Sequence, residues 1–189
     1  MARPKGILLA LLGVLCLYAV PIAVAQQSTP TPGMFPLPPG IELGASSNER
    51  LAPPPMPENP TQADLGAQVY YQVCMVCHGD RGQGLTEEWR GVLDPEDQDC
   101  WQSGCHHTKH PEGGFIFPKI VPPVVGAGLL AKYPTALQLH DYIRARMPWQ
   151  ARGARSEAEY WQLTAFLLRL NEVDAGLIPL DADRAANIV

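Results

Sequence analysis

The sequence Cys74-Met75-Val76-Cys77-His78 places two thiols three positions apart, with an imidazole directly after the second. This C-x-x-C-H pattern is typical of a c-type haem attachment site. At that spacing both sulfurs reach the two vinyl-derived carbons on one edge of the porphyrin, and the adjacent histidine binds the iron as proximal ligand. A C-x-x-C pair without the histidine would indicate a redox dithiol or half of a zinc site. The motif therefore predicts one covalent haem c held by Cys74, Cys77 and His78.

Helical patterns lie on both sides of this motif. Thr61 and Asp64 form a T-x-x-D capping box, and the apolar stripe that follows leads into the motif at the helix end. A second helix is predicted over 134–146, and a third over 156–171, where Ser156 and Glu159 form another capping box. Because no alternating strand pattern occurs, the sequence predicts an all-α domain.

These residues resemble the class I c-type cytochromes. Gly66-x-x-x-Tyr70-x-x-x-Cys74 is similar to the glycine and aromatic pair that leads into the attachment motif of that family, and His78-Gly79 followed by a G-x-G turn matches as well. The resemblance spans residues 61–172 and implies the class I cytochrome c fold. In that fold Gly66 lets the first helix cross the last helix at close range, with Phe166 as the expected aromatic partner across the contact.

Two further positions carry implied roles. Pro122-x-Val124-x-Gly126 is similar to the family's P-x-L-x-G, whose proline carbonyl accepts the N–H of the proximal histidine and fixes its orientation. Pro122 is the first candidate for that carbonyl, and the adjacent Pro123 is the alternative. Met147-Pro148 is similar to the pair that supplies the family's distal methionine.

The chemistry of Met147 supports the same role independently. A thioether is a neutral, soft donor that suits ferrous iron and raises the reduction potential. Of the five methionines, only Met147 stands outside both the segment 1–60 and the attachment motif. His140 is the rival distal ligand, although we expect it to be a surface residue of its helix. Predicted iron ligands are therefore His78 and Met147.

The segment between the haem motif and Pro122 is longer than the family usually allows. This insertion, residues 94–118, contains Cys100 and Cys105, and His106 follows directly. A local disulfide between Cys100 and Cys105 is the prediction that we favour, because exported proteins keep disulfides and the insertion is short, polar and rich in glycine.

Two other interpretations of the insertion stay open. Some multihaem cytochromes use the C-x4-C-H spacing for attachment, which would make His106 a second proximal ligand and His107 or His110 a distal one. A metal site is the third interpretation.

Residues 1–60 differ from the rest of the chain in composition. In residues 1–25, Arg3 and Lys5 precede an almost wholly apolar run from Ile7 to Val24, and Ala23-Val24-Ala25 resembles a cleavage site. The run is about 27 Å long as a helix, which also suits a membrane anchor. Residues 26–60 contain ten prolines and predict an extended spacer. A spacer favours a retained anchor over a cleaved signal, and either places the rest of the chain outside the cytoplasm.

Charge narrows the choice of partners. Without residues 1–25 the chain carries 12 basic and 19 acidic residues, a net charge of about −7, which argues against nucleic acid and anionic lipid as partners. Basic side chains nevertheless gather from the end of the second helix onward and flank the methionine: Arg144, Arg146, Arg152 and Arg155. These arginines and the acidic run in the insertion are each candidates for docking a redox partner. Residues 173–189 are expected to form a weakly structured tail.

The leading hypothesis is a one-electron carrier with a single haem, exported to the periplasmic face of the membrane, and not an enzyme in its own right. We expect it to be a subunit or tethered partner of a respiratory or photosynthetic membrane complex. One alternative is a dihaem, peroxidase-type enzyme with the second haem at Cys100, Cys105 and His106. Another is a structural zinc module that uses Cys74, Cys77, Cys100 and Cys105.

Overall fold

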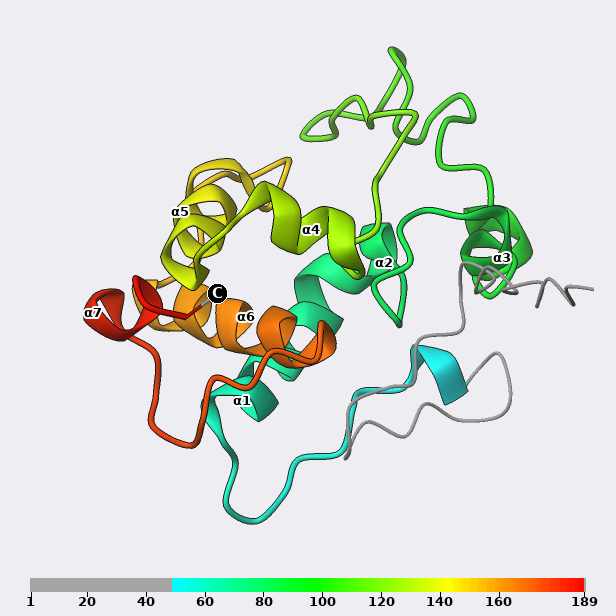
Figure 1. Cartoon of the computed structure of the whole chain (residues 1–189). Coiled ribbons are helices and arrows are strands. Elements are labelled where there is room, and N and C mark those ends of the chain that lie inside the picture. Colours follow the sequence, from blue (N-terminus) through cyan, green and yellow to red (C-terminus); the bar gives the residue numbers. More distant parts are fainter. Residues whose placement is uncertain (1–48, 189) are drawn as a thin grey trace, which may run out of the picture. The chain divides into compact units, whose positions relative to one another are not determined.

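The computed structural model describes residues 49–188, and all regular elements in this range are helical (Figure 1). The α-helices are α1 (Gln62–Val69), α2 (Met75–His78), α3 (Glu87–Arg90), α4 (Ala127–Lys132), α5 (Ala136–Arg146), α6 (Glu157–Leu170) and α7 (Ala182–Ala185). A π-helical turn, η2 (Tyr70–Cys74), joins α1 to α2, and two 3-10 turns are η1 (Glu49–Leu51) and η3 (Pro95–Asp97). The described part of the chain is thus all-helical, as predicted.

Two predictions about the start of the chain lie outside the described residues. These are the signal or anchor at 1–25 and most of the spacer, up to residue 48. Within residues 49–188, no helix has the length and apolar character needed to cross a membrane.

The predicted capping boxes are both formed. The Thr61 Oγ1 accepts the backbone N–H of Asp64 at 3.3 Å, and the Asp64 carboxylate accepts the N–H of Thr61 at 2.8 Å. Ser156 and Glu159 repeat this exchange at the start of α6, at 3.2 Å and 2.7 Å. Each pair satisfies two backbone donors that the first turn leaves without helical partners, which fixes where α1 and α6 begin.

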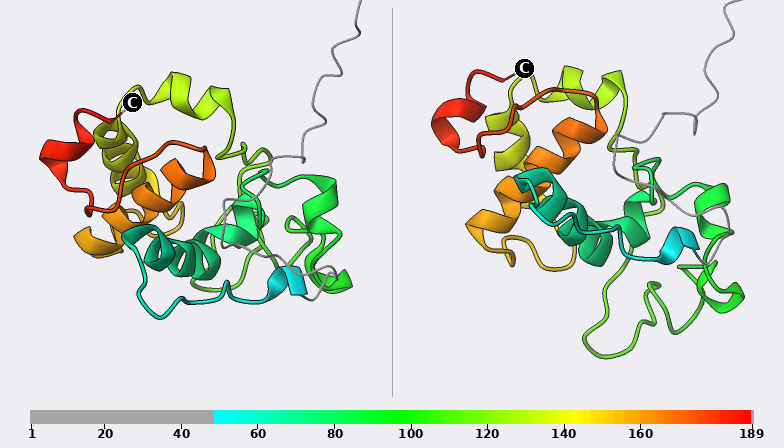
Figure 2. Two further views of the ribbon diagram at one scale, coloured as in Figure 1. Left: turned by 60° about the horizontal axis from the view of Figure 1, so that its bottom comes forward. Right: turned by 90° about the horizontal axis from the view of Figure 1, so that it is seen from below.

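The core is built on the crossing of α1 and α6, which lie against each other in all three views (Figures 1 and 2). Gly66 stands at the crossing: a Cβ placed on it would lie 1.9 Å from the Gln162 carbonyl oxygen and 2.9 Å from the Phe166 Cβ. One turn later, the rings of Tyr70 and Phe166 pack with centroids 5.0 Å apart. The close approach predicted at Gly66, and Phe166 as its aromatic partner, are therefore confirmed.

We expect the substitution Gly66→Ala to destabilise the protein by on the order of 3 kcal/mol or more, because the added methyl overlaps backbone atoms and forces the two helices apart. Urea unfolding of the purified protein measures the change.

A matched control is Gly128→Ala in α4, where a Cβ meets no atom within 4 Å. That substitution should leave the free energy of unfolding unchanged or raise it by about 0.5–1 kcal/mol, since alanine has the higher helix propensity. Equal effects of the two substitutions would contradict the assigned crossing.

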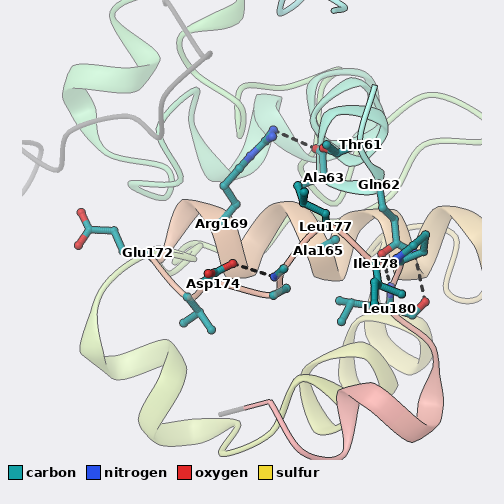
Figure 3. A pocket seen from close by; sticks show the side chains of 14 residues that line it. Thr61, Gln62, Ala63, Ala165, Arg169, Glu172, Asp174, Leu177, Ile178 and Leu180 are labelled. Carbon is teal, nitrogen blue, oxygen red and sulfur yellow. Dashed lines mark hydrogen bonds between the residues drawn. The ribbon is translucent and has the colours of Figure 1, made fainter. Parts of the chain in front are cut away.

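The C-terminal residues are packed, so the prediction of a weakly structured tail at 173–189 is wrong for the described part. Leu180 and Ala185 are buried, and the Gln62 side chain makes two hydrogen bonds to the backbone of Leu180, at 3.2 Å and 2.7 Å. Residues 173–180 line an open pocket of about 680 Å³ together with residues of α1 and α6. Figure 3 shows the side chains around this pocket. Further on, the Ile188 carbonyl accepts the N–H of Ala136 at 2.9 Å, which ties the segment to α5.

The described end of the proline-rich segment is also attached to the domain. The Arg50 guanidinium makes two hydrogen bonds to the buried carboxylate of Asp80, at 2.6 Å and 2.7 Å, and a third to Glu88. The Tyr71 hydroxyl donates to the Leu51 carbonyl at 2.8 Å. Residues 49–51 therefore belong to the packed domain, and the spacer predicted to run to residue 60 differs from the structure there. Residues 49–51 contain no proline, and the charge pairs of Arg50 hold them against the domain.

Asp64 joins the start of α1 to the end of α6. Burial alone would raise the pKa of this carboxyl, but hydrogen bonds from Thr61 and from the Arg169 guanidinium, at 2.6 Å, lower the pKa below its ordinary 3.8. A carboxylate with a lowered pKa contributes stability at neutral pH, and that contribution is lost as the pH falls through the folded-state pKa.

Below pH 4 we therefore expect part of the loss of stability to come from Asp64. In the Asp64→Asn variant, the free energy of unfolding should depend less on pH between 5 and 2 than in the wild type, as measured by urea unfolding at each pH. Glu58→Gln, at an exposed position, is the control and should keep the wild-type slope.

Candidate cofactor site

The two thiols of the C-x-x-C-H motif lie on consecutive helical turns at the end of η2 and in α2. Both side chains are half-buried and both are free thiols. Burial raises the pKa of Cys74 to about 12 and that of Cys77 to about 11. Both groups are therefore neutral thiols at physiological pH, the form in which an S–H bond is available to add to a vinyl group.

The histidine that follows is oriented by a neighbouring segment of backbone. The Gly84 N–H donates to the His78 carbonyl at 2.8 Å, and the Leu85 N–H donates to the Val121 carbonyl at 3.2 Å. Gly84 has φ of 79°, and a Cβ there would lie 2.5 Å from the Val121 oxygen, so only glycine permits this approach. The glycine turn thus lays the segment that begins at Val121 beside the histidine.

His78 Nδ1 lies 3.2 Å from the Pro122 carbonyl oxygen. Because a carbonyl only accepts hydrogen bonds, Nδ1 carries the proton in this contact and Nε2 keeps its lone pair. Burial lowers the pKa of His78, against a smaller opposite effect of the hydrogen bond, so the imidazole is neutral at pH 7. The structure thus selects Pro122 over Pro123 as the orienting carbonyl and gives His78 the form of a metal ligand.

The methionine loop, residues 147–155, connects α5 to α6 and is fixed by Tyr160. The Tyr160 hydroxyl donates to the Met147 carbonyl at 2.9 Å and accepts the N–H of Arg155 at 3.3 Å. Met147 is half-buried and packs against the core, as does Cys74. The positive charge of Arg155 acts to lower the pKa of Cys74, against the larger effect of burial. Met147 and Cys74 thus pack against the same hydrophobic core.

We expect Tyr160→Phe to release the methionine loop while it preserves the packing of the ring. The loss of these two part-buried hydrogen bonds should cost about 1–2 kcal/mol of stability. If the protein carries the predicted haem with Met147 as ligand, the far-red sulfur-to-iron absorption band of the oxidised form should also weaken.

Tyr71→Phe is the matched control, because its hydroxyl also donates to a backbone carbonyl, that of Leu51, but far from Met147 in the chain. It should cost similar stability and leave the spectrum unchanged. Identical spectra of all three proteins would rule out a role of Tyr160 in placing Met147.

His140, the rival distal ligand, is buried, so the prediction of a surface residue is wrong. Its exposed fraction is 2%, and its ring stacks on Trp161 with centroids 3.6 Å apart. Nδ1 lies 3.1 Å from an Asp141 carboxylate oxygen, and Nε2 lies 3.3 Å from one of Glu157. With both ring nitrogens beside carboxylates and the ring packed between α5 and α6, His140 serves the helix contact. Met147 remains the stronger candidate ligand.

Cys100 and Cys105 lie in the insertion, and each is half-buried and a free thiol. The disulfide between them therefore stays a prediction. Among residues 49–188, no group of three or more His, Cys, Asp or Glu side chains is arranged to hold a metal ion. The zinc module with four cysteines as ligands thus has no support in this geometry.

Trp89 and Thr86, which shape the site, were not singled out in the sequence, and Tyr70 was named only for its place before the motif. The Tyr70 hydroxyl donates to the Gly79 carbonyl at 2.8 Å, and the fully buried Trp89 donates its indole N–H to the Val76 carbonyl at 3.1 Å. Both satisfy backbone carbonyls around the motif. Thr86 caps the short helix α3 that carries Trp89, and this threonine ahead of Glu-Glu-Trp was the available signal.

The basic residues around the methionine loop are partly paired. Arg144 contacts Glu157 at 2.8 Å, and Arg155 lies 3.7 Å from Glu159. Trp149, 44% exposed, carries the Arg152 guanidinium over its ring at 4.9 Å. An exposed aromatic residue with cations beside it is a feature of protein contact surfaces, so this loop is a candidate docking face.

Comparisons of the chain with known protein families, with curated proteins and with solved structures gave no match. A family assignment therefore rests on the residues and geometry of this chain alone, and it is made below as a proposal.

Proposed function

We propose that the protein is an exported one-electron carrier with the class I cytochrome c fold. One haem c would be bound covalently through Cys74 and Cys77, with His78 and Met147 as axial ligands. The observation that carries this proposal is the contact of His78 Nδ1 with the Pro122 carbonyl at 3.2 Å, directly after the C-x-x-C pair. A redox dithiol needs no imidazole oriented in this way. A structural zinc site would need further ligands beside His78, and the described residues place no group of three or more His, Cys, Asp or Glu side chains together.

The residues around the motif fit the proposed group. The haem would supply the ferric and ferrous states of iron. The chain would hold the haem and set its reduction potential. Pro122 fixes the tautomer and direction of His78, which leaves Nε2 as the donor atom. Tyr160 holds the backbone of Met147, whose thioether is neutral and suits the ferrous state. The hydrogen bond of Tyr70 to Gly79 stiffens the backbone that carries His78.

The helix arrangement supports the proposed fold. The first and last long helices, α1 and α6, cross at Gly66 with Tyr70 against Phe166, as the resemblance to class I cytochromes implies. The methionine loop precedes α6, and the carbonyl segment at Pro122 precedes α4 and α5, also in the implied order. The exported location, the membrane anchor and the partner complex are proposed from residues 1–60 and are not described by the structure.

An electron carrier of this kind works by contact with redox partner proteins. The surface near Met147 carries Trp149, Arg152 and other arginines, whereas the chain as a whole is acidic. We propose that this face meets an electronegative partner in a respiratory or photosynthetic membrane complex, with electrostatic steering that weakens as salt increases. No substrate is transformed in this role, so we do not propose an enzyme.

Replacement of the distal ligand tests the proposal. We expect Met147→Ala to lower the reduction potential by on the order of 0.1 V, because the soft axial donor is lost, and to make the iron high-spin or open to added imidazole. The measurements are potentiometric titration and absorption spectra of natively matured protein. Met56→Ala, which removes an exposed methionine of the proline-rich segment, is the control and should change neither property.

Two outcomes would contradict the proposal at different points. A natively matured protein without a Soret band would rule out haem altogether. An unchanged spectrum and potential in Met147→Ala would keep the haem but exclude Met147 as its ligand.

A further inference from the structure

The insertion after α3 contains a second cysteine pair followed by a histidine (green segment, Figure 1). Its backbone is folded on itself: the Cys105 N–H donates to the Gln102 carbonyl at 3.0 Å, and the His106 N–H donates to the Cys100 carbonyl at 3.0 Å. The second bond closes the segment 101–105 into a loop. These bonds bring the backbones of Cys100, Cys105 and His106 close together, although the two cysteines are five positions apart in sequence.

His106 is oriented in the same manner as His78. Its Nδ1 lies 3.3 Å from the Phe115 carbonyl oxygen, as that of His78 lies 3.2 Å from Pro122. In this contact too the carbonyl accepts, so Nδ1 carries the proton and Nε2 keeps its lone pair. In both motifs a cysteine pair is followed by a histidine whose Nδ1 is held by a carbonyl further along the chain, and this leaves Nε2 as the atom that can bind a metal.

Aromatic side chains stand around this histidine. Ring centroids of His106 lie 4.4 Å from Phe115 and 5.5 Å from Phe117, and Phe117 is buried. The Phe117 N–H donates to the His106 carbonyl at 3.1 Å, and the Trp101 indole donates to the Phe117 carbonyl at 3.2 Å. These contacts give the polar, glycine-rich loop an apolar side. A disulfide does not need such a surface, whereas a porphyrin needs apolar side chains to pack against.

The second motif lies beside the first. Helix α3 connects them, because Trp89 binds the Val76 carbonyl while Arg90 donates to the Gln98 carbonyl at 3.1 Å and stands 5.6 Å from the Trp101 ring.

We propose that Cys100, Cys105 and His106 form a second covalent haem site. The inference rests on the proposed function, since it assumes the same export and haem supply. It assigns to the cysteine pair a role other than the disulfide predicted from the sequence, because a disulfide makes no use of the oriented imidazole. The protein would then carry two electrons, one at each centre.

The attachment step balances without an oxidant. Each thiol adds across one vinyl group of haem b: the S–H bond breaks, a C–S bond forms at the carbon next to the ring, and the hydrogen goes to the terminal carbon. The chain therefore gains the whole mass of a haem at each site. Formation of a disulfide would instead remove two protons and two electrons from Cys100 and Cys105, a loss of two hydrogens in mass, and would need an oxidant.

Peptide mapping of the protein purified from its own organism separates the two sites. Trypsin releases Cys74 and Cys77 in the peptide 51–81, and Cys100 and Cys105 in the peptide 91–109. We expect haem mass on both peptides and two haems per chain by the pyridine haemochrome assay. Haem on 51–81 alone, with 91–109 lighter by two hydrogens or bearing free thiols, would overturn the second site. Absence of haem from 51–81 would instead contradict the proposed function.

Variants in the native host complete the test. Cys100→Ser with Cys105→Ser should halve the haem content and leave haem on 51–81, and His106→Ala should change the spectrum of about half the haem. Ser103→Ala, an exposed position in the same loop, is the matched control and should keep both haems. Full haem content in the double cysteine variant would disprove the site.

Discussion

The structure depends on the absence of one side chain. At Gly66 the backbones of α1 and α6 approach so closely that a single methyl group has no room. The C-x-x-C-H motif lies on the continuation of α1, and the methionine loop leads into α6. The crossing of these two helices therefore also determines where the two predicted ligands, His78 and Met147, lie in the domain. The capping boxes at Thr61 and Ser156 then fix where each helix begins, so the register of the crossing follows from local hydrogen bonds.

The orientation of His78 does not come from the packing of helices. It comes from loops in which backbone groups bind backbone groups of segments far away in the chain, as between Leu85 and Val121. Such contacts need glycines where a Cβ would collide, and Gly84 is one of them. The hydrogen bond of Nδ1 fixes the tautomer of the ring, and the tautomer decides which nitrogen is free to bind a metal. The chemistry proposed for the site therefore depends on loop geometry as much as on the motif.

Local patterns in the sequence predicted the three longest helices, α1, α5 and α6, well, and they missed the short helices α3, α4 and α7 and the packing of the loops. The starts of α1, α5 and α6, the close approach at Gly66 and the pairing of His78 with Pro122 were all readable, because each follows from a short motif. The burial of His140 was not readable, since its neighbours on α6 are distant in sequence and an aromatic stack with Trp161 overrides its polarity. Arg50 and Leu180 were missed for the same reason: single long-range contacts hold segments whose own composition suggests no structure.

The attachment of residues 180–188 has a consequence for the order in which the fold would form under the proposed export. The haem motif emerges early, whereas α6, the Leu180 contact with Gln62 and the Ile188 contact with Ala136 are completed only by residues near the other end of the chain. Until those residues arrive, α1 has no partner at Gly66, and its thiols are not yet enclosed by the core. Under the proposed function, late closure of the fold would leave Cys74 and Cys77 accessible for covalent attachment of the haem until the last residues of the chain have arrived.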